Sequence, residues 1–185
     1  MSDIKQLIAY KLQDGRAFLK RWSASIITFA ITFVVMQIVL YFIRFPTVDG
    51  NSMLPTYQDG TQVAIFYTKN VTYDDIIIIW CDDLNEHVIK RVMGMSGDHI
   101  VIDSEGLHRN GELLIEPYVS NQSWALYSEK IDVIVPDGEL FIMGDNRVES
   151  TDSRVFGTIS ENEIFGKVLG ESPIVKFFSL FEKSE

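Results

Sequence analysis

The chain contains 185 residues, 46% of them hydrophobic, and carries a formal net charge of −10 at pH 7. This length suits one domain of modest size plus an anchor, and the acidic balance argues against nucleic acid as a partner, because carboxylates repel phosphate. Cys81 is the single cysteine, which excludes an internal disulfide and, with three scattered histidines, a zinc site of the Cys/His type. No metal ion or cofactor is expected.

The N-terminal part of the chain predicts a transmembrane helix. Residues 23–43 contain no charge over 21 positions, which at 1.5 Å per residue spans about 30 Å of hydrocarbon. We therefore expect a cytoplasmic segment at residues 1–21 and a transmembrane anchor at residues 22–44. Most basic residues of this part precede the apolar run, and the positive-inside rule then places the N-terminus in the cytoplasm and residue 45 onward outside.

A cleavable secretory signal is the alternative interpretation of this apolar run. The run is longer than the usual signal core of about 7 to 15 residues, and no evident small-x-small cleavage site follows it. A single uncleaved anchor is therefore the favoured interpretation.

After Pro46 the pattern changes to short runs that are rich in β-branched and aromatic residues, which is typical of strands. Turn residues separate the runs, and residues 109–112 (Arg-Asn-Gly-Glu) predict the tip of a hairpin. We expect a mainly β, antiparallel domain at residues 45–185. Its last apolar run, residues 174–181, is expected to be a closing strand, with contact to the membrane surface as the alternative. The predicted strands are residues 62–67, 76–80, 87–92, 99–102, 131–135 and 139–143.

Ser52 lies shortly after the apolar run and is a candidate nucleophile. A serine hydroxyl needs a neighbouring base to take its proton as it attacks. The three histidines lie in no recognisable triad setting and are interpreted as ordinary polar residues, which leaves lysine. Burial can lower the pKa of a lysine by several units from about 10.4, and Lys90 follows an apolar stretch in a predicted strand.

Each of these features has a plain structural interpretation when it is taken alone. Ser52 could be a turn residue, and Lys90 with Arg91 a solvated surface pair. Residues 144–146 could be an ordinary loop, and Asp152 with Arg154 a structural ion pair. Their joint occurrence favours a serine and lysine hydrolase that is tethered to a membrane.

The chain resembles type I signal peptidases, which are membrane-anchored endopeptidases with a Ser/Lys dyad, from the anchor through residue 170. The resemblance rests on four ordered blocks, and the short inserts between the last two resemble the small Gram-positive enzymes. It implies the coiled antiparallel β fold of signal peptidases and SOS repressors. The matching blocks are GNSMLPT at 50–56, KRVMGMSGD at 90–98, EPY at 116–118 and GDNRVESTDSRVFG at 144–157.

The resemblance also implies a function. It is the removal of N-terminal signal peptides from exported preproteins by cleavage after small residues, as in Ala-x-Ala. The implied partners are preprotein signal peptides, membrane lipid and the secretion translocase. The implied location is the bacterial cytoplasmic membrane, with a single pass and the catalytic domain outside.

The roles of individual residues follow from the matching positions. Ser52 would be the nucleophile and Lys90 the general base, with Ser150 hydrogen-bonded to the Lys90 amine. The Ser52 backbone N–H would serve in the oxyanion hole. Gly50 stands where some relatives have a serine that supplies a second donor, so that donor would be a backbone N–H or absent. Supporting roles in the loop of the last block fall to Asp145, Arg147, Asp152 and Arg154.

The substrate would bind as an extended strand beside residues 46–50 and 87–90. Four apolar side chains would line shallow pockets for small residues, although the same four could equally be plain core residues. Two positions depart from the family: Ser96 replaces a usual proline, and the acidic stretch 80–86 matches poorly, which leaves substrate preference open. The four candidate pocket residues are Val48, Met53, Val88 and Ile89.

Two alternative functions share parts of this pattern. A non-cleaving peptide-binding factor for surface or pilus assembly would have no physical need for Ser52, Lys90 and Ser150. A self-cleaving SOS repressor would carry a DNA-binding module and an Ala-Gly cleavage site, and this chain has neither.

Overall fold

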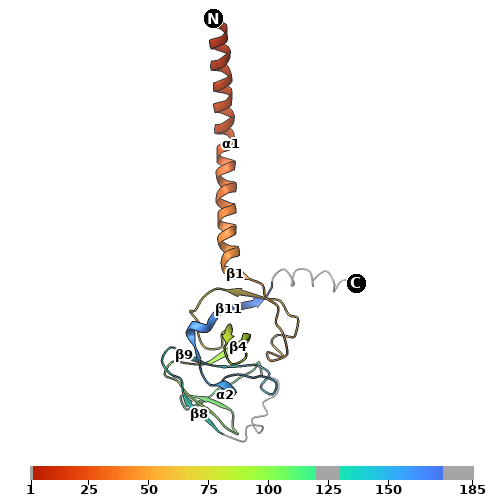
Figure 1. Cartoon of the computed structure of the whole chain (residues 1–185), viewed down its shortest axis with the longest axis vertical. Helices are drawn as coiled ribbons and strands as arrows, with labels where there is room; N and C mark the ends of the chain where they lie inside the picture. Colours follow the sequence, from red (N-terminus) through yellow and green to blue (C-terminus); the bar gives the residue numbers. More distant parts are fainter. Residues whose placement is uncertain (1, 120–129, 173–185) are drawn as a thin grey trace, which may run out of the picture. The chain divides into compact units, whose positions relative to one another are not determined.

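The computed structural model describes residues 2–119 and 130–172. The chain divides into two compact units, Met1–Phe42 and Ile43–Glu185 (Figure 1). The predicted closing segment at residues 174–181 lies outside the described residues.

The first unit is one continuous helix, α1 (Ser2–Phe42). Its part from Arg21 to Phe42 is long and apolar enough to cross a membrane, and none of that part is buried inside the protein. Phe29, for example, is 73% exposed. A long apolar helix whose side chains stay exposed is expected where lipid covers them. The placement of residues 1–21 in the cytoplasm and of the domain from residue 45 onward outside stays a prediction.

The second unit consists of two antiparallel sheets, which confirms the predicted fold class of a mainly β domain preceded by one apolar helix. A short helix, α2 (Ser153–Phe156), and a 3-10 turn, η2 (Glu161–Glu163), lie between strands. The larger sheet has the spatial order β1 (Ile43–Arg44), β2 (Val63–Phe66), β11 (Ile164–Glu171), β3 (Ile76–Cys81), β4 (Glu86–Met95), β9 (Glu139–Met143) and β10 (Ile159–Ser160). The smaller sheet has the order β7 (Glu112–Leu113), β6 (Leu107–Arg109), β5 (His99–Ile102) and β8 (Ile131–Ile134).

The six strands predicted from the sequence correspond to β2, β3, β4, β5, β8 and β9. The predicted hairpin tip also forms between β6 and β7, with Asn110 and Gly111 both at positive φ. The sequence did not reveal β11, although it lies between β2 and β3 in the larger sheet. Two glycines interrupt its apolar pattern. One of them, Gly166, is required by packing, since a Cβ there would lie 2.9 Å from the carbonyl oxygen of Phe66.

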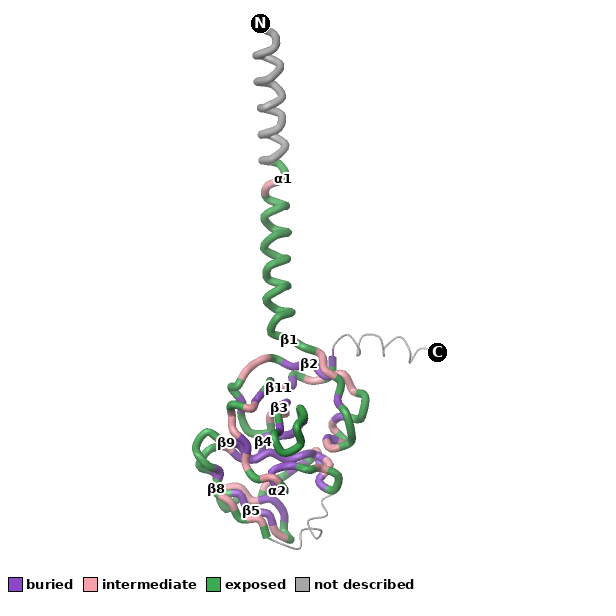
Figure 2. The backbone as a smooth tube through the Cα atoms, in the orientation of Figure 1, coloured by how far each residue is buried: buried purple, intermediate pink, exposed green. Residues whose placement is uncertain are grey.

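Strand β4 is longer than predicted and connects the cores of the domain. It pairs with β3 on one side and with β9 on the other. Near its end, Gly94 lets the chain approach Ile100 of the smaller sheet, because a Cβ at Gly94 would lie 2.9 Å from the Ile100 Cδ1. Buried residues therefore follow β4 along most of its length (Figure 2). The core cluster shared by the two sheets contains Met93, Ile100, Ile102, Leu107, Val135, Phe141 and Met143.

Substitution of Ile142 in β9 tests how tightly the core of the larger sheet is packed. Its side chain is fully buried, so Ile142→Ala should lower the free energy of unfolding by about 2–5 kcal/mol, which combines lost burial with the cavity left behind. Ile134→Ala in β8, where the side chain is 67% exposed, should change it by less than about 0.5 kcal/mol. Urea denaturation of the full chain in detergent micelles measures both. Equal effects of the two substitutions would contradict this packing.

Candidate active site

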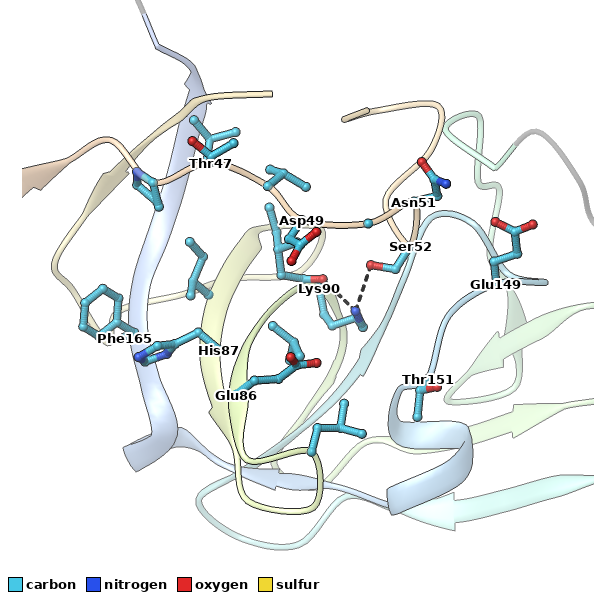
Figure 3. Close-up of a pocket in the computed structure, with 18 residues that line it drawn as sticks. Thr47, Asp49, Asn51, Ser52, Glu86, His87, Lys90, Glu149, Thr151 and Phe165 are labelled. Carbon is cyan, nitrogen blue, oxygen red and sulfur yellow. Dashed lines mark hydrogen bonds between the residues drawn. The ribbon is translucent and has the colours of Figure 1, made fainter. Parts of the chain in front are cut away.

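Ser52 and Lys90 lie 38 residues apart in sequence and meet in space. Ser52 belongs to the turn segment between β1 and β2, and Lys90 lies in the middle of β4. The Lys90 Nζ donates to the Ser52 Oγ at 3.0 Å and to the Ile89 carbonyl oxygen at 3.0 Å (Figure 3). This distance is within the range that proton transfer between a nucleophile and its base requires.

Lys90 is withdrawn from water, with 3% of its surface exposed. In β4 it pairs with Ile77 of β3, and the pairing of β4 with β9 begins only at the next residue, Arg91. Burial lowers the pKa of the Lys90 amine, whereas the charges of Asp152 and Glu86 act in the opposite direction. At a given pH, a larger fraction of this amine is therefore neutral than in an exposed lysine, and a neutral amine can accept the serine proton.

The segment that carries Ser52 is anchored on both sides of the nucleophile. Met53 is fully buried in a core cluster with Val48 and Ile65. Gly50 adopts φ +81°, and its backbone N–H donates to the Asp59 Oδ1 at 2.8 Å. A side chain at position 50 would strain the backbone in this conformation. Because Asp59 already holds the Gly50 N–H, that group is not a free oxyanion donor.

Asp152 organises the loop that follows β9. Its carboxylate is fully buried and accepts from the Gly144 N–H at 2.9 Å and from the Ser150 hydroxyl at 2.7 Å. The Arg154 guanidinium binds the same carboxylate, with 2.6 Å from Nε to Oδ1. Ser150 therefore contacts Asp152, while the described hydrogen bonds of the Lys90 amine go to Ser52 and Ile89.

Gly144 brings this loop against the nucleophile. A Cβ at Gly144 would lie 2.5 Å from the Ser52 carbonyl oxygen and closer still to the Ser150 Oγ. The close approach lets the Asn146 N–H donate to the Ser52 carbonyl oxygen at 3.0 Å. The Asn146 side chain adds a second bond, from Nδ2 to the Asn51 carbonyl oxygen at 3.1 Å. Glycine at position 144 thus fixes the loop to the backbone of the serine segment.

A buried ion pair joins the residue after Lys90 to the same loop. Arg91 binds Asp145 through two parallel bonds, Nε to Oδ1 at 2.8 Å and Nη2 to Oδ2 at 2.6 Å. The Thr56 hydroxyl also donates to Asp145, and the Arg91 guanidinium stacks on the Tyr118 ring at 3.8 Å. Sequence reasoning missed Arg91, because a Lys-Arg pair is more often solvated.

A second buried ion pair was also missed. Arg147 donates from Nη1 to the Glu116 Oε2 at 2.9 Å and from Nε to the Gly144 carbonyl oxygen at 3.0 Å. The side chains of both ions are 2% exposed. Glu116 thereby fixes the loop that follows β9 through its ion pair with Arg147. Its place in the EPY block was the available signal, but nothing in the sequence named its partner.

The Ser52–Lys90 pair opens into a groove of about 550 Å³. Residues 46–52 form one part of the wall and residues of the β3–β4 hairpin another (Figure 3). Three of the four candidate pocket residues, Val48, Val88 and Ile89, line this groove. Met53 is in the core and is not among the lining residues. The lining is Pro46, Thr47, Val48, Asp49, Gly50, Asn51, Ser52, Val63, Ile78, Leu84, Glu86, His87, Val88, Ile89, Lys90, Glu149, Thr151 and Phe165.

The Glu116–Arg147 pair generates a stability prediction. Glu116→Ala leaves a guanidinium buried without its carboxylate, so the free energy of unfolding should fall by about 3–5 kcal/mol. Glu112→Ala in β7, where the residue is exposed, is the matched control and should change it by less than about 0.5 kcal/mol. Denaturant unfolding measures both variants. If Glu116→Ala lowers the free energy of unfolding as little as the control does, the ion pair does not stabilise the fold.

Comparison with known proteins agrees with this geometry. Residues 19–170 match the family model described as signal peptidase, peptidase S26. Signal peptidase IB of Staphylococcus aureus (strain Mu50) is 32% identical over 163 residues, which cover 77% of this chain and 85% of that protein. Signal peptidase I of Bacillus amyloliquefaciens is 36% identical over 160 residues, with coverages of 78% and 80%.

Among solved structures, a crystal structure of a signal peptidase I from Enterococcus faecalis V583 is similar to part of the chain. It is 28% identical with a TM-score of 0.46, and the match covers 53% of this chain and 96% of that one. The family match over residues 19–170 and the identity to curated relatives carry the conclusion: this chain belongs to the signal peptidase family, peptidase S26.

Proposed function

We propose that this protein is a membrane-anchored endopeptidase that removes N-terminal signal peptides from exported preproteins, with Ser52 as nucleophile and Lys90 as general base. The observation that carries the proposal is the 3.0 Å hydrogen bond between the Lys90 Nζ and the Ser52 Oγ. Lys90 itself is 3% exposed. Family membership supports the peptidase activity and the class of substrate.

The chemistry follows from this pair. The neutral Lys90 amine takes the proton of the Ser52 hydroxyl as Oγ attacks the carbonyl carbon of the residue before the cut. The Ser52 backbone N–H faces the oxyanion that forms. When the peptide C–N bond breaks, the Lys90 ammonium returns its proton to the leaving amine. Lys90 then removes a proton from the water that attacks the acyl-enzyme and returns it to the Ser52 Oγ as the bond between Oγ and the acyl carbon breaks, which regenerates Ser52 and the neutral amine.

The surrounding residues position the pair. Asp152, held by Arg154, orients Ser150 and Gly144 beside the serine segment. Arg91 with Asp145 fixes the chain directly after Lys90. A preformed site of this kind needs little reorganisation during the reaction. This preorganisation is the main source of electrostatic catalysis.

The substrate binds extended along the groove, between residues 46–50 and 87–90. Val48, Val88 and Ile89 form narrow apolar walls that fit small side chains at the first and third positions before the cut. Met53 was expected beside these residues. It lies in the core and supports this wall from within.

The anchor determines where the reaction takes place. The basic residues before α1's apolar part favour an N-terminus in the cytoplasm and a catalytic domain outside the bacterial cytoplasmic membrane. Preproteins emerge there, so membrane lipid and the secretion translocase are the expected partners. A non-cleaving assembly factor is not favoured, because its groove would not need a desolvated lysine against a serine.

Removal of either member of the pair should abolish cleavage. Ser52→Ala and Lys90→Ala should each lower kcat by roughly 10⁴-fold or more on a preprotein whose signal ends in Ala-x-Ala, because each removes a group that acts at the reacting atoms. Ser104→Ala and Lys130→Ala are matched controls away from the groove and should keep full activity. Cleavage by Ser52→Ala at the rate of the unmodified chain would disprove the proposal.

A lysine base also predicts the pH dependence. Burial lowers the pKa of Lys90, yet the amine must still lose its proton before attack, so kcat/KM should rise as pH rises through that pKa. Activity should therefore fall steadily on the acid side and be highest under alkaline conditions. A profile of kcat/KM against pH with Ser52→Ala as blank tests this. A maximum below about pH 6 would exclude lysine as the base.

A further inference from the structure

The hairpin between β3 and β4 departs from the family blocks, and the structure places part of it in the substrate groove. The groove is lined by Leu84, at the tip of the hairpin, and by Glu86, the first residue of β4. The hairpin turns at Asn85, which has φ +54°, and the Asn85 N–H donates to the Asp82 carbonyl oxygen at 3.3 Å. Leu84 is 38% exposed and lines the groove, so a ligand in the groove can contact its side chain.

The charges along the groove have one sign apart from the catalytic lysine. Asp49, Glu86 and Glu149 contribute carboxylates, and Lys90 is the one lysine or arginine among the described lining residues. Within the described part of the chain, Asp49 and Glu86 have no ion-pair partner. Asp49 comes from the segment before Ser52 and Glu86 from β4, so the two carboxylates approach the groove from different walls (Figure 3).

The register of β4 places Glu86 relative to the cut. Side chains alternate along a strand, so Glu86, Val88 and Lys90 share one face. At about 3.3 Å per residue, Glu86 lies about 13 Å along the strand from Lys90. An extended substrate has nearly the same rise. In a substrate that runs parallel to β4, the fourth or fifth residue before the cut therefore reaches Glu86 when the residue before the cut reaches Ser52.

We propose that Leu84 and Glu86 form a subsite for a lysine or arginine at the fourth or fifth position before the cut. This inference rests on the proposed function, in which the signal-peptide half of the substrate lies along β4. The apolar stem of the basic side chain packs on Leu84, and its charged end meets Glu86, with Asp49 adding a second negative charge from the other wall. An acidic residue at the same position is repelled.

Peptides that differ at one charge test the proposal. Signal-sequence peptides ending in Ala-x-Ala, with Lys, Gln or Glu at the fourth or fifth position before the cut, are assayed with the full-length protein in detergent micelles. We expect kcat/KM to be roughly two- to fivefold higher for Lys than for Gln, and lower for Glu by a similar factor, as for an exposed ion pair. The preference should shrink in about 1 M NaCl, where charges are strongly screened.

Variants of Glu86 identify the group responsible. Glu86→Gln should reduce the difference between the Lys and Glu peptides to the part that Asp49 supplies, while still cleaving the Gln peptide, and Glu86→Lys should reverse the order. Glu112→Gln, which is exposed in β7 and does not line the groove, should keep the preference of the unmodified chain. Equal rates on all three peptides with the unmodified chain, or a preference that Glu86→Gln leaves undiminished, would overturn the proposal.

The role of Leu84 has its own comparison. Replacing the lysine of the best peptide by ornithine keeps the charge but shortens the apolar stem by one methylene, so kcat/KM should fall with the unmodified chain. Leu84→Asn should reduce that difference, and an unchanged difference would contradict a contact between Leu84 and the stem. Cleavage of these peptides by Ser52→Ala would instead refute the proposed function, so the two failures are distinguishable.

Discussion

The site depends on a buried lysine amine that, among the described residues, forms no ion pair with a carboxylate. Lys90 pairs with Ile77 of β3, one residue before the pairing of β4 with β9 begins, and its described hydrogen bonds go to a serine hydroxyl and a backbone carbonyl. Neither acceptor carries a full charge that would stabilise an ammonium. Removing an ammonium from water is costly, so the neutral form becomes accessible and the amine can act as a base.

Unlike Lys90, the other buried cations around the site are paired with carboxylates. Arg91, Arg147 and Arg154 are each bound to a carboxylate, with distances of 2.5 to 2.9 Å. Removing one partner of such a pair would leave an uncompensated charge buried in the protein. They join β4, the EPY block and the loop after β9 around the serine segment. The same neighbourhood thus keeps its arginines charged for structure and its lysine available for chemistry.

The sequence indicated much of the fold because strands and turns are local features. Short runs rich in β-branched and aromatic residues located six strands, and Asn110-Gly111 located a hairpin, since both depend on residues close together in the chain. It failed at β11, where Gly166 looks like a breaker until the carbonyl oxygen of Phe66 is seen beside it. Arg91 and Glu116 were missed for a related reason: a charged residue in isolation looks solvated, and only its distant partner shows that it is buried.

From sequence, one can therefore read the apolar helix, the β character of the domain and, through family blocks, the residue types that perform the chemistry. Those properties depend on composition, spacing and short motifs. The tertiary structure decided which groups meet: Lys90 with Ser52, Ser150 with Asp152, and the β3–β4 hairpin with the groove beside Ser52. Burial and contact between residues far apart in the chain arise only when the sheets pack, and the reactivity of the amine depends on both.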